Sequence, residues 1–570
     1  MSFRFSPREN RAHEILWNSW GQHAFERAKT EHKPILLSIS AIWCHWCHVM
    51  DETTYSNPEI IARINELYVP VRIDNDERPD INARYNMGGW PTTAFLTPDG
   101  KLMTGATYLP PQQMSRALVD IAKYFTEHAD EIALQPDRSK MSKLDSDATR
   151  QSLDATPVLA VLDDASSSFD PEYGGFGEAP KFPHVDLLEL LLQRTRSVRD
   201  ERAAQMLTLT LRGMSNAGTY DHVEGGFFRY STTRDWSVPH FEKMAEDHAG
   251  LLRVLAGLVV ESHDERFLAT LQRTTHYIQT QFLDPTTHFF AGSQDADEVY
   301  FGLASEARVL HGAPYIDRTS YTNWTLGLAS AFFACALTLE DPTLTHDAMA
   351  TLDAVHERLR DDQGLLYHVL RAEEPPSVRG LLTDQVAYLR ALLDAYEYTG
   401  EHRFRERAEE MARRICEHFI DETGAAIDHL AYDEDFGRLA LTDHPLTENS
   451  HLAEALLRLQ TITQREQPVA WSILCAFAPT AGQSGIFAAS YARALERALA
   501  PATHVQLEGS SNAELRELRF AALRLQNPFV GIATTLTDLP QARALPCRGT
   551  ACGKPVHDAR LLANAFATLP

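Results

Sequence analysis

Apolar residues in the first 135 positions alternate between short unbroken runs and helical spacing. The runs at 35–39, 69–73 and 93–96 are typical of buried strands, and a turn at 98–100 joins the last of them to a further strand at 101–108. Helical spacing occupies 20–32, 44–50, 58–67, 77–85 and 111–132. This order predicts a small α/β domain over residues 1–135.

From about residue 151 to 500 one amphipathic helix follows another. About twelve such stretches begin near Thr156, His184, Arg199, His240, Asp264, Tyr321, Thr343, Leu381, His402, Leu446, Glu466 and Ile486. A similar turn, with Asp just past a helix end, recurs at 169–176, 220–227, 283–290, 360–366 and 420–426. A helix pair cannot bury both its faces alone, so the pairs must stack or close into a ring. The pattern predicts six hairpins in an (α/α)6 toroid, with the alternate turns on one rim.

Two further segments complete the predicted organisation. Residues 136–150 are polar and without periodicity, as expected of a linker. Residues 501–570 contain strand-like runs at 504–507 and 530–534 and helical stretches at 512–525 and 558–567. We therefore expect a multidomain chain, in which this C-terminal α/β segment either closes the toroid, as we favour, or forms a separate subdomain.

Composition narrows the possible partners. Lys and Arg total 53 against 78 Asp and Glu, a net charge of −25 in 570 residues, which disfavours nucleic acid. No run of about 18 apolar residues is present, so no membrane partner is expected. The N-terminus lacks an apolar leader, and the seven cysteines are odd in number and sparse, which fits a reducing, cytoplasmic location. The oligomeric state is left open.

Cys44 and Cys47 form the one CxxC motif in the sequence. The motif follows a strand and opens a helix, where unpaired N–H groups stabilise the thiolate of the first cysteine. The second cysteine, one turn on, can resolve a mixed disulfide. Pro91 stands directly before a strand, where a cis peptide bond beside the two thiols is expected. Cys44, Cys47 and Pro91 are therefore the candidate catalytic residues, with Trp43 as a substrate contact.

Three other interpretations of this motif stay open. The cysteines could be a coincidental surface pair, or a redox-silent domain could retain them for packing. Cys44, His45, Cys47 and His48 could bind zinc, but ligands so close on one helical turn cannot all reach one tetrahedral ion. We therefore expect neither a metal nor a cofactor.

Polar and aromatic residues follow the predicted turns and would face a central funnel if the turns share a rim. They include His184, Trp324, Thr383, Glu448 and His451. The candidate substrate-binding residues of the toroid are His240, Glu242, Lys243, Asp295, Asp297, Asp317, Arg318, Tyr321, Asn323, Asp384 and Asn449. Aromatic rings beside carboxylates and amides are what a sugar pocket requires.

The funnel allows glycoside hydrolysis by two carboxylates, epimerisation or isomerisation by His240 or His248, or binding without chemistry. Structural roles compete with each of these. Asp317, Asp384 and Asn449 could be helix caps, His240 a packed histidine, and Glu242 and Lys243 members of ion pairs. The recurring turn aspartates are assigned to turn geometry.

Several long sequence motifs carry a resemblance to a known protein family. They are WCHWCHVM (43–50), DNDERPDINARYNMGGWPTTAFLTPDGK (74–101), GATYLPP (105–111), FDPEYGGFGEAPKFPH (169–184), EGGFFRYSTTRDWSVPHFEKMAEDHAGLL (224–252), FAGSQDAD (290–297) and PCRGTACGKPV (546–556). With them the chain resembles the spermatogenesis-associated protein 20 family, whose bacterial members are known as thioredoxin domain-containing proteins. The resemblance covers nearly the whole chain. It implies a thioredoxin-like domain fused to a six-hairpin toroid similar to sugar epimerases and glycosidases.

Three functions follow as hypotheses. The favoured one is a cytosolic thiol–disulfide oxidoreductase whose substrate is a thiol-containing protein, with a toroid that binds carbohydrate. The second is a carbohydrate-active enzyme with a regulatory thioredoxin-like domain, and the third is a non-catalytic interaction protein. Cys547 and Cys552, spaced CxxxxC, are either two unrelated loop cysteines, which we favour, or a second dithiol that accepts electrons from Cys44 and Cys47.

Overall fold

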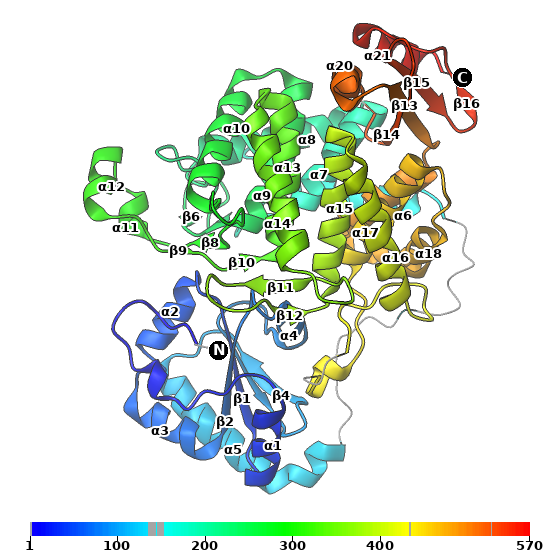
Figure 1. Ribbon diagram of the computed structural model, residues 1–570. Coiled ribbons are helices and arrows are strands. Elements are labelled where there is room, and N and C mark those ends of the chain that lie inside the picture. Colours follow the sequence, from blue (N-terminus) through cyan, green and yellow to red (C-terminus); the bar gives the residue numbers. More distant parts are fainter. Residues whose placement is uncertain (1–2, 135–143, 145–152, 432–434, 526, 570) are drawn as a thin grey trace. The chain divides into compact units, whose positions relative to one another are not determined.

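Figure 1 shows the computed structural model, which describes residues 3–134, 144, 153–431, 435–525 and 527–569. The chain forms two compact units. The first comprises Met1–Ser142, Gln294–Asp297 and His429–Asp443, and the second comprises Lys143–Ser293, Glu298–Asp428 and His444–Pro570. Apart from Leu144, the predicted linker at 136–150 lies outside the described residues.

The first unit is built on a four-stranded sheet in the order β2-β1-β3-β4. β1 runs parallel to β2 and antiparallel to β3, and every position of β1 is buried because apolar clusters cover both faces. The strands are β1 (Ile35–Ser40), β2 (Val69–Asp74), β3 (Thr92–Leu96) and β4 (Leu102–Ala106). The helices are α1 (Gln22–Glu31), α2 (His45–Glu52), α3 (Pro58–Leu67), α4 (Pro79–Tyr85) and α5 (Pro111–Leu134), preceded by η1 (Ala12–Glu14). The predicted order of strands and helices is confirmed.

A distant segment, 429–443, completes this unit. The Phe436 ring stacks on Phe25 of α1 at a centroid distance of 4.8 Å. The buried Arg84 of α4 donates from Nε to the Arg438 carbonyl at 2.9 Å, and Arg438 N–H donates to the Tyr85 hydroxyl at 2.7 Å. These contacts join residues more than 350 positions apart in sequence, which no local pattern could predict.

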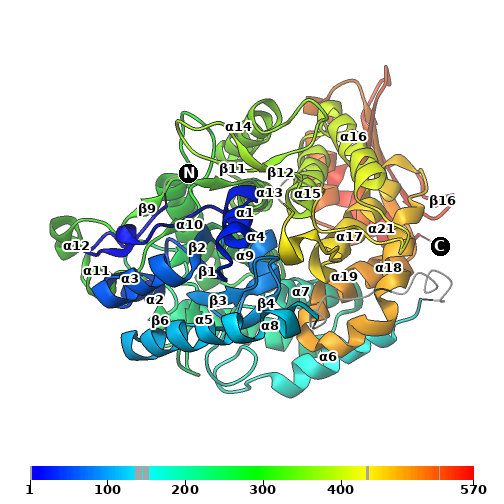
Figure 2. The same ribbon diagram turned by 90° about the horizontal axis from the view of Figure 1, so that it is seen from below.

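The second unit contains a closed ring of helices (Figures 1 and 2). Each inner helix packs on the next, and α19 packs on α7 to close the ring. The inner helices are α7 (Val185–Val198), α9 (Ala245–Ser262), α13 (Thr322–Leu339), α15 (Leu382–Thr399), α17 (Leu446–Thr463) and α19 (Ala489–Leu499). The outer helices, each packed on an inner one, are α6 (Thr156–Ser168), α8 (Glu201–Asn216), α10 (Glu265–Tyr277), α14 (Pro342–Arg358), α16 (His402–His418) and α18 (Pro468–Ala481). The predicted (α/α)6 toroid is confirmed.

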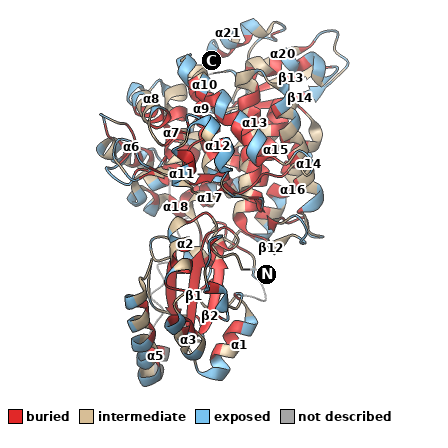
Figure 3. Cartoon of the chain, turned by 90° about the vertical axis from the view of Figure 1, so that its left-hand side faces the viewer, coloured by how far each residue is buried: buried red, intermediate tan, exposed pale blue. Residues whose placement is uncertain are grey.

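Burial explains why the inner helices are so apolar. Figure 3 shows that α13 and α15 carry long runs of buried positions. By length and composition alone, α13 and the stretch Pro468–Leu499 are apolar enough to cross a membrane. In the ring, 61% of the α13 stretch is buried against protein, as expected of an inner helix.

Short elements connect the ring helices. They are β5 (Tyr230–Ser231), β6 (Pro239–His240), β7 (Lys243–Met244), η3 (Ile278–Phe282), β8 (Ser293–Gln294), α11 (Glu298–Phe301), α12 (Ser305–His311), β9 (Ile316–Asp317), β10 (Ser320–Tyr321), β11 (Tyr367–Leu370), β12 (Ser377–Arg379), η4 (Gly437–Ala440) and η5 (Gly482–Ala488). Most are only two to four residues long, too short to carry a periodic signal.

A second sheet, in the order β14-β13-β15-β16, follows the ring. Its elements are β13 (Thr503–Gly509), α20 (Asn512–Leu523), β14 (Val530–Leu536), β15 (Arg543–Arg548), β16 (Ala551–Cys552), η6 (Ala559–Leu561) and α21 (Leu562–Ala567). The contact of α19 with α7 closes the ring before this sheet begins. The expectation that the segment closes the toroid is therefore corrected: it is an added α/β element with its own apolar core. Within it, Cys547 of β15 and Cys552 of β16 form a disulfide, so the favoured expectation of two unrelated loop cysteines is wrong.

Candidate functional site

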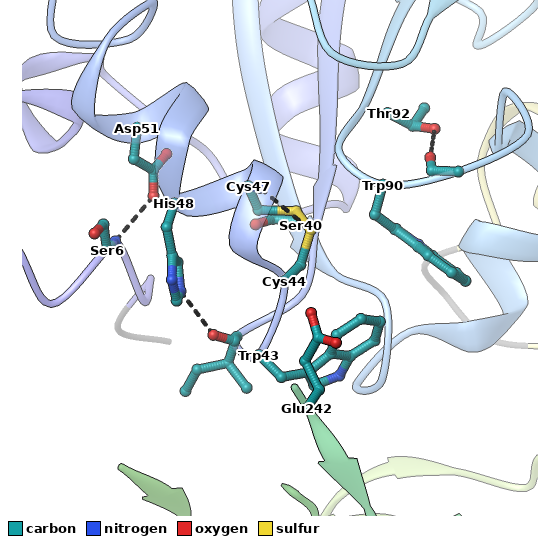
Figure 4. Close-up of a disulfide and its surroundings, with 12 residues drawn as sticks. Ser6, Ser40, Trp43, Cys44, Cys47, His48, Asp51, Trp90, Thr92 and Glu242 are labelled. Carbon is teal, nitrogen blue, oxygen red and sulfur yellow. Dashed lines mark hydrogen bonds between the residues drawn. A yellow bond between two sulfur atoms is a disulfide. The ribbon is translucent and has the colours of Figure 1, made fainter. Parts of the chain in front are cut away.

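The CxxC cysteines lie at the N-terminal end of α2 and form a disulfide (Figure 4). Cys44 is the N-cap of the helix, with non-helical φ of −80° and ψ of 109°. Its Sγ accepts the backbone N–H of Cys47 at 3.2 Å. The two residues are only 5% and 2% exposed, so a small part of Cys44 reaches solvent. The sulfur thus occupies the position that normally receives an anionic or polar cap.

Two tryptophans stand beside the disulfide (Figure 4). The Trp43 indole N–H donates to Asp76 Oδ2 at 2.6 Å, which fixes the buried ring. Trp90 meets it edge to face at a centroid distance of 5.7 Å. The peptide bond between Trp90 and Pro91 is cis, as predicted.

The side chain of His48, one position after the second cysteine, contacts the protein backbone. Its Nε2 lies 2.7 Å from the Ile42 carbonyl, and burial lowers the pKa of the imidazole. Across the described residues, no group of three His, Cys, Asp or Glu side chains is placed to hold a metal ion.

A cavity of about 520 Å³ opens at one end of the helix ring, and we call it the funnel. It is lined by the N-terminal halves of α7, α9, α13, α15 and α17, by the residues just before α7 and by η5. Its polar lining residues are His184, Asp186, Glu246, Asp247, Arg253, Asn323, Ser330, Thr383, Arg390, Thr447, Glu448 and His451, and its aromatic ones are Phe182, Trp324 and Phe487. The predicted central pocket therefore exists within the second unit.

Acidic groups dominate the electrostatics of the funnel. Burial, and then the neighbouring Glu246 carboxylate, raise the pKa of Asp247 to about 7. Burial also raises the pKa of Glu246 and of Glu448. Asp186 behaves oppositely: burial opposes its ionisation, but His451, whose Nε2 lies 2.9 Å from Asp186 Oδ1, helps to hold its pKa well below the usual range. The funnel therefore sets a protonatable carboxyl, Asp247, among carboxylates, an arrangement that can support proton transfer.

Asn323 and Asp384 are linked, but only Asn323 lines the funnel. Asp384, fully buried on α15, accepts the backbone N–H of Asn323 at 3.0 Å and so caps the neighbouring helix α13. Asp384 also contacts His368, whose Nδ1 lies 2.9 Å from Asp384 Oδ1. The expected pocket role of Asp384 is corrected to a bridging role between two inner helices.

Lys243 and Asn449 are also corrected. Both are fully buried and hold the recurring turns instead of facing a ligand. Lys243 Nζ donates to Asp221 Oδ2 and to the Gly225 carbonyl, each at 2.8 Å. The Asn449 amide pairs with both backbone groups of Ala426, at 2.7 and 2.8 Å.

His248 is excluded as a proton-transfer base. Its Nε2 accepts the Phe227 N–H at 2.8 Å, so its Nδ1 carries the proton and donates to the Met244 carbonyl at 2.6 Å. Burial lowers its pKa to about 4, so it stays neutral and clamps the turn.

The aspartates of the turns act as predicted. Asp170, Asp221, Asp284, Asp361 and Asp421 each accept the backbone N–H of the residue two positions on. This Asx geometry explains why the same residue recurs at each turn.

The remaining candidates are scattered. His240 Nδ1 lies 3.2 Å from Glu242 Oε1, and the imidazole stacks on Tyr230. Arg318 is exposed and donates to the Gln281 carbonyl.

Three more candidates lie elsewhere. The buried Asp317 accepts the Thr319 N–H at 3.1 Å, and the buried Tyr321 packs edge-on against Trp324. Asp295 and Asp297 belong to the segment grouped with the first unit, whereas the other toroid candidates belong to the second.

Sequence reasoning missed Asp186, Glu246 and Asp247. Each stands in the first turn of an inner helix, two to four residues after a position that the turn argument did reach. The helical periodicity could have identified these three residues, because first-turn residues on the helix face toward the ring axis line the funnel.

Comparison with known proteins agrees with the geometry of the first unit. Residues 7–144 match the family model Thioredox_DsbH, described as a protein of unknown function, DUF255. The first unit carries this thioredoxin-like domain. The thioredoxin-like domain is thus supported by strand order, by the placement of Cys44 and by the family match.

Spermatogenesis-associated protein 20 of three mammals matches about half of the chain, which corrects the expectation that the resemblance covers nearly all of it. The chain is 36% identical to spermatogenesis-associated protein 20 of Rattus norvegicus over 307 residues. This alignment covers 50% of the present chain and 39% of the rat protein. The chain is also 28% identical over 82 residues to the thiol:disulfide interchange protein DsbD of Pseudomonas fluorescens, and this alignment covers 14% of each chain. The match therefore spans about two fifths of the length of the rat protein.

Solved structures resemble the toroid at low identity. Cellobiose 2-epimerase from Spirochaeta thermophila aligns with a TM-score of 0.47 and 15% identity, over 60% of this chain and 94% of that one. The GH76 α-mannanase of Bacteroides thetaiotaomicron aligns with a TM-score of 0.45 and 11% identity, over 62% and 99%.

Proposed function

We propose that Cys44 and Cys47 form a thiol–disulfide exchange site. The hydrogen bond from Cys47 N–H to Cys44 Sγ, at the N-terminal end of α2, carries the proposal. In the reduced protein this bond and the helix dipole favour the thiolate of Cys44, which attacks a substrate disulfide. Cys47 then attacks Cys44 Sγ and releases the reduced substrate.

The surface near the sulfurs favours a protein substrate. Trp46, between the cysteines, is 47% exposed and packs on Tyr108 at a centroid distance of 5.2 Å. Half-buried Trp90 adds a second aromatic surface. Aromatic groups that are rigid and partly exposed are typical contacts for a polypeptide, so a cysteine-containing protein segment is the proposed substrate.

Reduction of insulin disulfides by the full chain, with dithiothreitol as electron donor, tests this function. Cys44→Ser should abolish turnover, and Cys47→Ser should accumulate a mixed disulfide at Cys44. Iodoacetamide at pH 6 should alkylate Cys44 at least roughly tenfold faster than a cysteine in an unstructured peptide. Absence of insulin reduction together with peptide-like alkylation would contradict the proposal.

A second activity is proposed for the funnel: binding of a carbohydrate, with Asp247 as the proton-transfer group. It is supported by the aromatic Trp324 beside Asp247, Glu246 and Glu448 in one cavity and by the pKa of Asp247 near 7. A sugar library should raise the melting temperature of the wild type but not of Trp324→Ala. Glu265→Gln, on the exposed start of an outer helix, is the matched control. No shift with any sugar would overturn the assignment.

A further inference from the structure

Another cavity, of about 300 Å³, lies inside the helix ring, and we call it the arginine chamber. All the inner helices, from α7 to α19, contribute to its lining, so it lies at the centre of the ring. It shares Arg253, Ser330 and Arg390 with the lining of the funnel and therefore adjoins the funnel. The arginines that line it are Arg196, Arg253, Arg390, Arg458, Arg493 and Arg497.

Carboxylates neutralise most of these guanidinium groups. Arg253 Nε donates to Glu189 Oε1 at 2.8 Å. Arg493 pairs with both Glu189 and Glu454. The other close ion pairs join Arg458 to Asp394 and Glu397, and Arg196 to Glu261. Six guanidinium groups thus stand against five carboxylates, which leaves one positive charge in excess.

Arg390 of α15 lacks a close counter-charge. Among the described residues its guanidinium reaches one carboxylate, Glu189 Oε2, at 4.0 Å, and it donates no hydrogen bond to them. Glu189 is already occupied by its closer ion pairs with Arg253 and Arg493. Burial, and then the neighbouring Arg253, lower the pKa of Arg390, as expected for a cation beside a like charge. An anion placed in the chamber would stabilise this charge.

Arg497 of α19 offers a donor that no described residue accepts. The side chain is only 9% exposed, and its buried Nε makes no hydrogen bond, since Glu454 Oε1 lies 3.9 Å away. The other two nitrogen atoms donate to the carbonyls of Pro528 and Phe529, at 2.6 and 3.3 Å. Burial lowers the pKa of Arg497 to about 10. A buried donor without an acceptor is costly, so the chamber favours an anion that accepts this bond.

We propose that the arginine chamber is a binding site for a phosphate or carboxylate group, which accepts hydrogen bonds from Arg390 and Arg497. The planar fork of a guanidinium matches the paired oxygen atoms of both groups. One such group also supplies the negative charge that the ion pairs of the chamber leave missing. The site does not depend on the thiol–disulfide exchange proposed for Cys44 and Cys47.

The bound group has two conceivable sources: a free anion, or a sugar that carries the charge while its ring occupies the funnel. Asp247 and Arg253 are six positions apart on α9, which corresponds to about 9 Å along the helix axis. A sugar beside Asp247 and Trp324 can therefore extend a charged group to Arg253 and Arg390, where the two cavities adjoin. Only this second source rests on the carbohydrate binding proposed for the funnel.

Isothermal titration calorimetry and thermal unfolding of the full chain test the site with inorganic phosphate, glucuronate and glucose 6-phosphate. Sodium chloride at equal ionic strength is the reference, because salts screen charges and phosphate also stabilises proteins by exclusion from their surface. At least one probe should bind and raise the melting temperature above this reference. Arg390→Gln should weaken that binding by roughly tenfold or more, as expected when a charge-assisted hydrogen bond is lost. Arg414→Gln is the matched control on α16, since this side chain is also 21% exposed and pairs with Glu410, and it should bind like the wild type.

The probes also separate the two sources. Affinity for phosphate at least equal to that for both sugar acids supports a free anion, whereas tighter binding of a sugar acid, with a preference that Trp324→Ala removes, supports an anionic sugar. Failure of neutral sugars to bind would contradict the proposed funnel activity and leave the chamber unaffected. The proposal is overturned if no probe binds beyond the chloride reference, or if Arg390→Gln binds as tightly as the wild type. Arg497→Gln provides a second variant, and circular dichroism verifies that each is folded.

Discussion

Asp51 of α2 and Arg72 of β2 form a buried ion pair with two hydrogen bonds, of 2.8 and 3.0 Å. The two side chains are 1% and 4% exposed. Two neighbours contact the pair: the Ser6 N–H donates to Asp51 at 3.0 Å, and the centroid of the Phe5 ring lies 4.8 Å from the Arg72 guanidinium. It therefore ties the helix that carries Cys47 to the central sheet.

Removal of one partner from this pair should destabilise the thioredoxin-like domain. Asp51→Asn leaves a buried guanidinium without its counter-charge, which costs about 3–5 kcal/mol of unfolding free energy. Urea unfolding followed by tryptophan fluorescence measures the change. Lys123→Gln, in the exposed pair with Glu127, is the control and should cost less than about 1 kcal/mol. An Asp51→Asn protein as stable as this control would contradict the assignment.

Substitution of two glycines by alanine allows the stability cost of backbone strain to be measured apart from that of steric conflict. Gly177 and Gly226 both have positive φ, of 78° and 83°. A Cβ at Gly177 meets nothing within 4 Å, but at Gly226 it would lie 2.8 Å from Tyr277 and 3.0 Å from His248 Nε2. Gly177→Ala should cost about 1 kcal/mol of unfolding free energy from strain alone.

Gly226→Ala should cost about 3 kcal/mol or more, because the added carbon also displaces the imidazole that clamps the turn. Thermal denaturation of the two variants side by side measures the difference. Equal melting temperatures for the two variants would show that His248 is not a rigid clamp.

The Asn449 amide is predicted to be a structural requirement of the toroid. Asn449→Ala leaves both backbone groups of buried Ala426 without their partners, at a cost of about 2–4 kcal/mol. Gln483→Ala provides the comparison, since this exposed amide donates to the Pro479 carbonyl at the protein surface. Guanidinium unfolding should show a loss for Asn449→Ala alone; a loss of similar size for Gln483→Ala would argue against the clamp.

Asp247 predicts a pH dependence of stability. Its pKa is raised from about 3.8 in the unfolded chain to about 7, so ionisation opposes folding. The penalty is absent below about pH 4, grows as pH rises to about 7, and is constant above. Asp247→Asn should therefore gain about 1–2 kcal/mol over the wild type at pH 8, after allowance for solvent in the cavity, and little at pH 4.

Chemical denaturation of both proteins at pH 4, 6 and 8 measures this difference. The exposed Glu265→Gln should show no comparable trend relative to the wild type. A difference between Asp247→Asn and the wild type that does not change with pH would show that Asp247 ionises normally in the folded protein.

Local patterns were sufficient for the order of elements. The apolar run at 35–39 became the central strand β1, and the start near Leu446 became the start of α17, because burial on both faces or on one stripe fixes the period. The turn aspartates were identified correctly for the same reason: an Asx turn is made within four residues.

The site was predicted less well, because proximity across the ring has no local signature. Lys243 and Asn449 carry polar groups at helix starts, as Asp186 and Glu448 do, yet the first two are buried in clamps and the last two line the funnel. Successive residues of a helix point in directions about 100° apart around its axis, so a shift of one position decides whether a side chain faces the funnel or a clamp. Only the packing of the helices fixes which residues face the funnel.

By itself the sequence determined the two folds and the position of the CxxC motif, since strand and helix periods and the N-cap of a helix are written in consecutive residues. Tertiary structure alone decided which polar side chains face the funnel, that the segment 429–443 joins the first unit, and that Cys547 pairs with Cys552. All three outcomes depend on free energies of burial and pairing between residues far apart in the chain, which composition and spacing do not encode.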